Sequence, residues 1–467
     1  MVPKIPLLIF SLILLLCSNI TKPMSSLSAL DQSSISRSLG VDFDKYHNYT
    51  EIMDTLLNLN ATYPAIVDVF SIGKSWQDRN IFCTRLTNES SERSKPEILF
   101  VGYSHARERI TAELLLHFVA YAAENYGVNE TVGQILDQTE IYVVVALNVD
   151  GFNIVEVNEW QRKNARPIDE DGDGMFDEDS PDDEDGDGFI EDLVEFNNSD
   201  SNFMRWEGLD NDADGRFNED WIGGVDLNRN YGHQWNATVD SGSLDPSAED
   251  YKGPAPFSEP ETQALRDLAL EHTFKYALSF HSGTEFISYP WGYTNEPPPD
   301  KEKFIQISKE LSELVDSHSF QSGVSYTLSG ALGDWIYWNR STLAFTCEIY
   351  GNLDAWKYET TSVQNVSWEK GVFEFFNPEP QEIEHTIQKW MPVFFYVADR
   401  AIREEVPNSL DLSRLIWIIA TVTAITILFV AAFFFRRNQR RLWEDNDVLV
   451  KITLESGKWW SAVVLFS

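Results

Sequence analysis

The strongest constraint on the fold is a series of short, continuously apolar segments that alternate with segments of helical periodicity. The apolar segments of strand length include EILFVGYS, IYVVVALN and YALSFHS at residues 97–104, 141–148 and 276–282. Apolar residues recur at helical spacing in residues 49–64, 111–127 and 382–402. Continuous apolar strands separated by helices are typical of α/β domains, in which helices cover both faces of a sheet. We therefore expect one α/β domain over residues 42–403.

The chain is strongly acidic, with 74 Asp and Glu against 36 Lys and Arg in 467 residues and a net charge of −38. Nucleic-acid binding requires clustered basic residues, so this charge argues against a nucleic-acid partner. Besides Cys17, the chain contains only Cys83 and Cys347, which are too few for a disulfide-stabilised scaffold. One disulfide bond stays open as an alternative, but two buried free thiols are the favoured interpretation.

Both ends of the chain have the pattern of membrane-directed segments. Residues 1–24 join a basic Lys4 to an apolar run, which is typical of a secretory signal peptide; an uncleaved anchor is the alternative. Residues 415–435 are 21 uncharged residues, long enough for a transmembrane helix, and RRNQRR follows at once. The positive-inside rule then places the tail, residues 436–467, in the cytoplasm. The sequence thus predicts a single-pass cell-membrane protein whose large domain is extracellular or lumenal.

Linkers and glycosylation sequons are also predicted, and the sequons agree with export of the large domain. Short linkers are predicted on either side of it, at residues 25–41 and 404–414. N-x-S/T glycosylation sequons begin at Asn48, Asn60, Asn88, Asn129, Asn197, Asn236, Asn339 and Asn365. Such triplets also arise by chance in polar sequences, so they support the prediction of a glycoprotein without proving it.

Polar residues that follow the apolar segments are candidate metal ligands. His105 and Glu108 come just after residues 97–104, and His281 ends the segment YALSFH. Zinc accepts imidazole nitrogen and carboxylate oxygen, and a catalytic zinc site keeps one position for water. An H-x-x-E match alone is weak in so acidic a chain, and a surface ion pair is the alternative. The distant His281 strengthens the prediction of a zinc site.

Two more segments carry residues suited to catalysis and binding. Glu348 lies inside the apolar segment LAFTCEIYG, where an unpaired carboxylate is costly to bury. A general base beside a zinc site would explain it, whereas a buried salt bridge is the structural alternative. Asn228 and Arg229 place a neutral donor beside a planar cation, which suits capture of a carboxylate. The alternative for Arg229 is a solvated loop residue.

Together these segments resemble the zinc metallocarboxypeptidase family of the carboxypeptidase A, B and T type, over residues 46–403. The resemblance implies an α/β/α sandwich around a mixed, mostly parallel eight-stranded sheet. It implies one catalytic zinc ion held by His105, Glu108 and His281. It implies Glu348 as general base and Arg162 as the residue that stabilises the oxyanion. The implied substrate-binding residues are Arg107, Asn228, Arg229, Tyr326 and Thr346.

The implied activity is release of C-terminal residues from peptides or proteins by zinc-activated water. Family members that prefer basic C-terminal residues carry an acidic residue in the side-chain pocket. The matching positions here are Gly292, Ala331, Leu332 and Gly333, none of which is acidic. Asp334 matches a structural Asp of the family. A neutral or apolar C-terminal side chain is therefore expected, although Glu285 near the rim could alter this preference.

Two other functions are weighed against this one. A related zinc amidase or endopeptidase, acting for example on cell-wall peptides, would not need the carboxylate clamp of Asn228 and Arg229. An inactive, calcium-dependent cell-surface binding module would tolerate loss of a zinc ligand or of Glu348, and all of these residues are present. Both observations favour the carboxypeptidase.

Residues 167–221 form an acidic insertion between Arg162 and Asn228. The pattern D-x-D-x-D-G occurs in it three times, with the acidic positions Asp169, Asp171, Asp173, Asp183, Asp185, Asp187, Asp210, Asp212 and Asp214. All-oxygen loops of this kind suit Ca²⁺ and not zinc. No copy is a complete EF-hand, because the twelfth position is never Glu. We predict structural calcium binding, with a disordered acidic loop as the alternative.

Overall fold

The computed structural model describes residues 44–90, 94–156, 161–169, 174, 176–177, 223–352 and 372–405, with isolated positions between 421 and 435. The chain divides into two compact units, residues 1–405 and 406–467. The predicted signal peptide, both linkers and the cytoplasmic tail lie outside the described residues, apart from residues 404–405 of the second linker. The predicted span at 415–435 is described at only some positions. Among the residues that are described, no helix is both long and apolar enough to span a bilayer.

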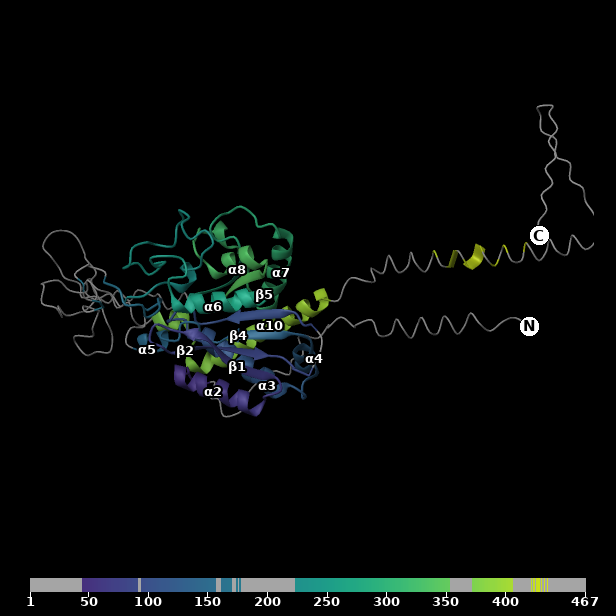
Figure 1. Ribbon diagram of the computed structural model, residues 1–467, viewed down its shortest axis with the longest axis horizontal. Helices are drawn as coiled ribbons and strands as arrows, with labels where there is room; N and C mark the ends of the chain where they lie inside the picture. The colour runs from purple at the N-terminus through teal and green to yellow at the C-terminus, as the bar shows by residue number, and fades with distance from the viewer. Residues whose placement is uncertain are drawn as a thin grey trace, which may run out of the picture. The chain divides into compact units, whose positions relative to one another are not determined.

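An eight-stranded mixed sheet forms the centre of the first unit (Figure 1). Its strands are β1 (Val67–Lys74), β2 (Asn80–Leu86), β3 (Glu97–Val101), β4 (Glu140–Val144), β5 (Phe274–His281), β6 (Thr284–Tyr289), β7 (Ser319–Gln321) and β8 (Leu343–Tyr350). The order across the sheet is β1-β2-β4-β3-β5-β8-β6-β7. The pairs β4–β3, β3–β5, β5–β8 and β6–β7 are parallel, and the other three are antiparallel. The predicted mixed, mostly parallel sheet of eight strands is confirmed.

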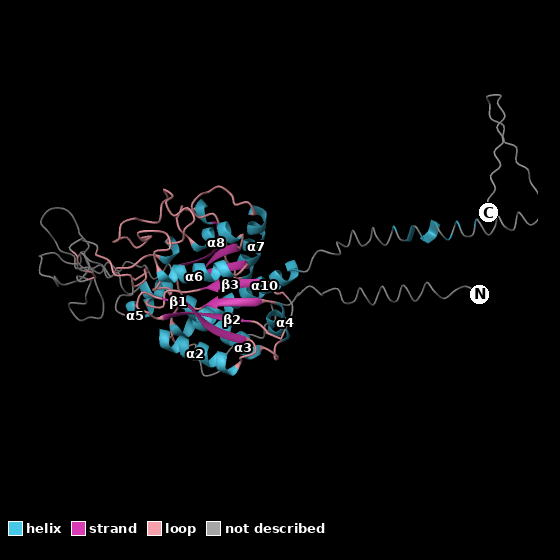
Figure 2. Ribbon diagram, viewed as in Figure 1, coloured by secondary structure: helices cyan, strands magenta, loops and turns pink. Residues whose placement is uncertain are grey.

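Helices cover both faces of this sheet. They are α2 (Tyr49–Thr62), α3 (Ile110–Asn125), α4 (Glu130–Gln138), α5 (Gly151–Ile154), α6 (Pro260–Glu271), α7 (Lys301–Leu314), α8 (Leu332–Arg340), α9 (Val372–Phe376) and α10 (Ile383–Glu405). Short 3-10 turns are η3 (Leu227–Arg229), η4 (Ser322–Val324) and η5 (Pro380–Glu382). In Figure 2, α6 and α8 lie on one side of the sheet and α2 and α3 on the other. This three-layer arrangement is the expected α/β/α sandwich.

Helix α3 is buried around its whole circumference, although its sequence reads as amphipathic. Every residue from Ile110 to Ala123 is buried. The reason is its position, because α3 contacts the sheet, α2 and α10. On the side of α10, the rings of Phe118 and Phe394 stack at 4.3 Å, and Phe100 of β3 meets both edge-on. The core is therefore continuous from the central strands to the C-terminal helix.

The central parallel strands determine where functional side chains meet. Parallel neighbours end at the same edge of a sheet, so polar residues that follow them converge there. Strands β3, β5 and β8 are consecutive in the sheet, and His281 of β5 is in register with Glu348 of β8. Cys83 on β2 and Cys347 on β8 are buried free thiols, as the favoured interpretation of the sequence predicted.

Candidate metal centre and substrate cavity

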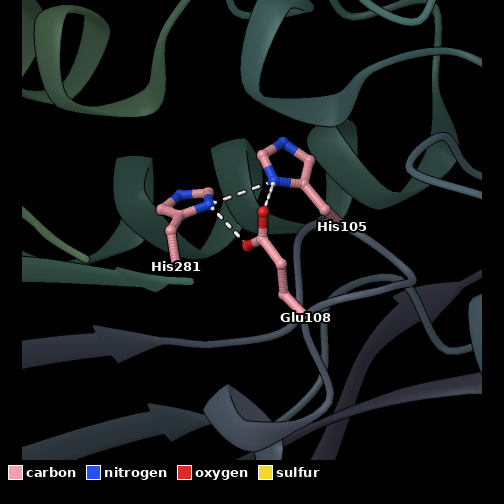
Figure 3. Close-up of side chains that lie close together, drawn as sticks. All are labelled: His105, Glu108 and His281. Atoms are coloured by element: carbon pink, nitrogen blue, oxygen red, sulfur yellow. Dashed lines mark hydrogen bonds and ion pairs between the residues drawn. The ribbon is translucent and has the colours of Figure 1, made fainter. Parts of the chain in front are cut away.

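His105, Glu108 and His281 meet at the carboxyl edge of the sheet (Figure 3). The Glu108 carboxylate lies between the two rings, with Oε1 2.7 Å from His105 Nδ1 and Oε2 3.0 Å from His281 Nδ1. The two Nδ1 atoms are 3.2 Å apart. All three side chains are buried, and their donor atoms lie within 4.8 Å of one another. The predicted ligand set is thus assembled in space.

Local structure explains this convergence. His105 and Glu108 occupy the turn between β3 and α3, where Glu108 N donates to His105 O at 3.2 Å. The turn is tied to the start of α3 by Thr111, whose Oγ1 accepts from Tyr103 N and donates to Glu108 O. His281 is the last residue of β5, the parallel neighbour of β3. Two ligands from one turn and one from the next strand therefore face a common point.

The chemistry of these donor atoms fits a zinc ion. His105 Nε2 lies 3.1 Å from Asp226 Oδ1, and a hydrogen bond donated there leaves Nδ1 as the nitrogen available to a metal. His281 Nε2 lies 3.0 Å from Ser279 Oγ, so its Nδ1 likewise faces the carboxylate. Burial, followed by the charge of Arg162, lowers the pKa of His105 and favours the neutral, ligating form. Catalytic zinc sites use ligand sets of this kind, in which two imidazole nitrogens and a carboxylate bind the metal and hydrogen bonds to neighbouring residues hold the ligands in place.

Asp226 is the main site residue that the sequence reasoning missed. Its Oδ2 accepts from Arg162 Nε at 2.9 Å and lies 3.9 Å from Arg229 Nη1, and its Oδ1 accepts from Asn228 N at 2.9 Å. Burial opposes ionisation of Asp226, but Arg162, Arg229 and then His105 hold its pKa well below the ordinary value. Its only sequence signal was an Asp in the otherwise apolar start of GVDLNRNY. One carboxylate therefore links the predicted metal triad to the cations that are predicted to bind substrate.

Glu348 lies beside the triad on the central strand β8. Within the described residues its carboxylate accepts no hydrogen bond, and it lines the cavity with His281 and Glu108. Burial, the largest effect, raises the pKa of Glu348 to about 7, with His281 acting in the opposite direction and Glu108 in the same one. A carboxylate with a pKa near neutrality can both accept and return a proton. The buried salt bridge that was the alternative does not form among these residues.

A cavity of about 220 Å³ opens directly in front of the triad. It is lined by His105, Glu108, His281 and Glu348, and by the predicted residues Arg162, Asn228, Arg229, Tyr326 and Thr346. Of the predicted substrate-binding residues, only Arg107 is not part of this lining. Its guanidinium forms a two-point ion pair with Glu249, at 3.1 and 3.2 Å.

The predicted carboxylate clamp is supported from behind. Asn228 and Arg229 lie on the turn η3, and Asn228 Oδ1 accepts from Leu332 N at 3.1 Å. Arg229 Nε donates to Ser241 Oγ at 3.0 Å, and the Arg229 side chain is only 6% exposed. Tyr326 is 47% exposed at the cavity mouth. The clamp thus consists of two fixed groups deep in the cavity and one exposed ring.

Among the described residues, the part of the cavity that would receive the substrate's C-terminal side chain has no acidic group that is free to pair with a basic side chain. Gly292, Ala331 and Gly333 line the cavity as expected, but Leu332 is 3% exposed and contributes only its backbone nitrogen. Asp334 accepts hydrogen bonds from Gly292 N and Tyr293 N, and burial raises its pKa to about 7. Glu285 is paired with Lys389 and does not line the cavity.

Of the nine predicted calcium ligands, only Asp169 belongs to the described residues, where its Oδ2 accepts from Gly174 N at 3.1 Å. Asp171, Asp173, Asp183, Asp185, Asp187, Asp210, Asp212 and Asp214 lie outside the described part of the chain.

The two ends of the insertion are held together at the cavity. Asn164 N donates to Val225 O at 3.1 Å, and Asn164 Oδ1 accepts from Val225 N at 2.8 Å. Asp177 Oδ1 accepts from both Ile168 N and Gly223 N. The segments that bear Arg162 and Asp226 are therefore paired neighbours, despite the long stretch of sequence between them.

Comparison with known proteins agrees with this geometry. The sequence model of the family described as zinc carboxypeptidase matches residues 52–392. Human mast cell carboxypeptidase A is 24% identical over 307 residues, which are 63% of this chain and 60% of the relative. Pig carboxypeptidase A1 is 27% identical over 320 residues, 66% of this chain and 63% of the relative. The chain thus spans somewhat less than two thirds of the length of these relatives.

Among solved structures, the crystal structure of carboxypeptidase A from Helicoverpa armigera is similar, with a TM-score of 0.57 and 20% sequence identity. The match covers 87% of this chain and 88% of that one. At 20% sequence identity, this structural similarity establishes the fold alone.

Proposed function

The chain belongs to the zinc carboxypeptidase family, and from this premise we propose that it releases C-terminal residues from peptides or proteins by zinc-dependent hydrolysis. One observation carries the proposal. The buried triad of His105, Glu108 and His281 shares a single cavity with the carboxylate clamp of Asn228 and Arg229. A clamp for a free carboxylate beside a metal centre is what an exopeptidase needs, because it places the last peptide bond at the metal.

His105, Glu108 and His281 would hold the zinc ion. When bound, zinc supplies Lewis acidity, which polarises a carbonyl group and acidifies water. Glu348 accepts the proton of the attacking water and returns it to the departing amine, a role that its pKa of about 7 supports. Arg162 lines the same cavity and is fixed by Asp226, so its charge is available to a developing oxyanion without reorganisation.

Asn228, Arg229 and Tyr326 would bind the terminal carboxylate of the substrate. The planar guanidinium of Arg229 provides parallel donors, and its tether to Ser241 limits the entropy that binding must remove. Thr346 forms part of the cavity wall. We propose a neutral or apolar C-terminal side chain, because Asp334 is committed to backbone groups and Glu285 to Lys389.

The test compares the zinc-loaded full chain with its Glu348→Gln variant on pairs of peptides with free or amidated C-termini. We expect the wild type to release single C-terminal residues from free-acid peptides only, and to lose activity when zinc is chelated. In the variant we expect a rate that is roughly 10²- to 10⁴-fold lower, which is the size of the contribution of general-base catalysis. Internal cleavage, or equal cleavage of amidated peptides, would indicate the amidase or endopeptidase instead. No hydrolysis by either protein would favour a binding module.

We also propose that the enzyme is anchored in the cell membrane by residues 415–435, with residues 1–24 as its signal peptide and the catalytic unit outside the cytoplasm. The uncharged length of 415–435 and the arginines after it support this orientation. The experiment expresses the chain in intact cells and adds protease outside. We expect the catalytic unit to be digested and a C-terminal epitope tag to be protected; release of the protein by alkaline carbonate would contradict anchoring.

The insertion at 167–221 is proposed to bind structural Ca²⁺. Its three D-x-D-x-D-G patterns support this, since crowded carboxylates repel one another without a cation. Its ends adjoin Arg162 and Asp226, so folding of the insertion would also stabilise the cavity. A calcium-selective chelator is expected to increase proteolysis within the insertion in the zinc-loaded protein. Unchanged proteolysis and unchanged activity would rule out this role.

A further inference from the structure

A clasp between Asp240 and Thr327 fastens the loop that bears Tyr326 to the segment that follows the turn η3. Thr327 N and Thr327 Oγ1 both donate to Asp240 Oδ2, each at 2.9 Å. In return, Asp240 N donates to Thr327 Oγ1 at 3.1 Å. These hydrogen bonds join two residues that are 87 positions apart in the chain, so they fix one loop against another.

Further hydrogen bonds connect the clasp to the proposed carboxylate clamp. Ser241 N donates to Thr327 O at 3.0 Å, and Ser329 N donates to Ser241 O at 3.1 Å. The hydroxyl of the same Ser241 accepts from Arg229 Nε at 3.0 Å. Arg229 and the loop that bears Tyr326 are therefore tied to one short segment of the chain.

The position of Tyr326 at the cavity mouth depends on this clasp. Tyr326 is 47% exposed, and its hydroxyl group makes no hydrogen bond with any residue that the structure describes. Thr327 lies between two residues that line the cavity, Tyr326 and Leu328. Fixing Thr327 therefore limits the positions that the Tyr326 ring can reach. Order that exists before the substrate arrives reduces the entropy that binding must remove.

The carboxylate of Asp240 suits this role because it stays charged. Asp240 is exposed, and the hydrogen bonds from Thr327, first from its backbone nitrogen and then from its hydroxyl, lower the pKa of Asp240. A charged acceptor forms stronger hydrogen bonds than a neutral one. The clasp therefore persists at neutral pH.

We propose that Asp240 is a positioning residue of the carboxylate clamp, which through Thr327 holds Tyr326 where its ring can meet a substrate carboxylate bound to Arg229. Asp240 does not line the cavity itself, so it acts only through the loop. Its role concerns the binding of the terminal carboxylate and not the proton transfer at Glu348. This inference rests on the proposed carboxypeptidase function and adds the residue that orders the clamp.

The test measures kcat and KM of the zinc-loaded full chain on a free-acid peptide. In Asp240→Ala we expect KM to rise roughly three- to tenfold, the effect of losing about one net hydrogen bond, while kcat stays close to that of the wild type. Asp240→Asn should keep a KM near that of the wild type, because its amide oxygen can accept both bonds from Thr327. In the Tyr326→Ala background, Asp240→Ala should not raise KM further, since the ring that the clasp positions is absent.

Asp245→Ala is the matched control, because Asp245 is exposed in the same segment and has bonds of the same kind. Its Oδ1 accepts from Ser247 N at 3.1 Å and from Ser247 Oγ at 2.8 Å, but this partner is only two residues away. The variant removes the same charge without touching the loop of Tyr326, and it should leave KM unchanged.

Two outcomes would overturn the inference. Asp240→Ala could keep the KM of the wild type, or it could raise KM as much in the Tyr326→Ala background as in the wild type, which is what a general loss of structure would do. If Asp240→Ala does not fold, Thr327→Val, which loses only the hydroxyl, decides by the same comparison in the two backgrounds. If the wild type releases no C-terminal residue from any free-acid peptide, the proposed function fails, and this inference fails with it.

Discussion

Asp226 joins the predicted metal triad to the cations that are predicted to bind substrate, because one of its oxygens lies 3.1 Å from His105 Nε2 and the other accepts from Arg162 Nε at 2.9 Å. The first bond selects the form of His105 whose Nδ1 is free to ligate. The second holds the guanidinium that faces the cavity. Disturbance of a single buried carboxylate should therefore weaken metal binding and catalysis together.

Asp226→Asn should weaken zinc binding by roughly 10- to 100-fold, the usual effect of losing a hydrogen-bond partner of a metal ligand. The amide can no longer balance the charge of Arg162, and it accepts a weaker hydrogen bond from His105. Zinc affinity of the metal-free protein, measured by competition with a fluorescent chelator, tests this. Asp267→Asn, on the exposed face of α6, is the control. Equal zinc affinities in Asp226→Asn and wild type would show that Asp226 does not support the metal.

Arg229→Ala should lower kcat/KM for free-acid peptides by at least about 30-fold, the equivalent of about 2 kcal/mol for a truncated buried charge contact. The loss should appear mainly in KM, since the carboxylate is bound in both the ground and the transition state. Steady-state kinetics at fixed zinc concentration provide the measurement, with the surface variant Arg266→Ala as reference. A fall in kcat alone, with KM unchanged, would mean that Arg229 does not bind the carboxylate.

Gly330→Ala should destabilise the protein by about 2 kcal/mol or more and impair the clamp. Gly330 has φ +65°, and a Cβ atom there would lie 1.9 Å from the carbonyl oxygen of Arg229. Gly133→Ala is the matched control, because Gly133 is inside α4 and an added Cβ meets nothing within 4 Å. That change should be neutral or stabilise by up to about 1 kcal/mol. Urea unfolding would detect the difference, and equal stabilities of the two variants would refute the clash.

His47 should make stability depend on pH through its buried pair with Glu113, in which His47 Nδ1 and Glu113 Oε2 are 2.8 Å apart. Burial lowers the pKa of His47, but the hydrogen bond and charge of Glu113 outweigh it and raise the pKa above 6.5. The folded state therefore binds the proton more tightly than the unfolded state. This contribution is complete below pH 6.5 and is lost as the pH rises through the higher folded pKa.

Urea unfolding of wild type and His47→Gln at pH 6 and pH 9 tests this dependence. The stability lost on substitution should be larger at pH 6 than at pH 9. The same substitution at His318, which has no ion pair with a described residue and only ring contacts with Phe286 and Phe320, is the control. A loss that is equal at both pH values would mean that the pair contributes nothing through protonation.

The sequence by itself determined the fold class, most element positions and the chemistry of the site. Apolar runs at β3, β5 and β8 require burial, and a polar residue at the end of such a run has few reasons to be there except function. His105, Glu108, His281 and Glu348 were recognisable for that reason. The length and lack of charge of residues 415–435 predict a membrane span, and this stays a prediction.

Only the tertiary structure decided which groups share hydrogen bonds across long separations in the chain. It pairs Asp226 with His105 and Arg162, joins the two ends of the insertion through Asn164, and commits Arg107 to Glu249. It also buries α3 on all sides and turns Leu332 away from the cavity. Such contacts depend on distances between elements, whereas local patterns in a sequence report only which face of each element is apolar.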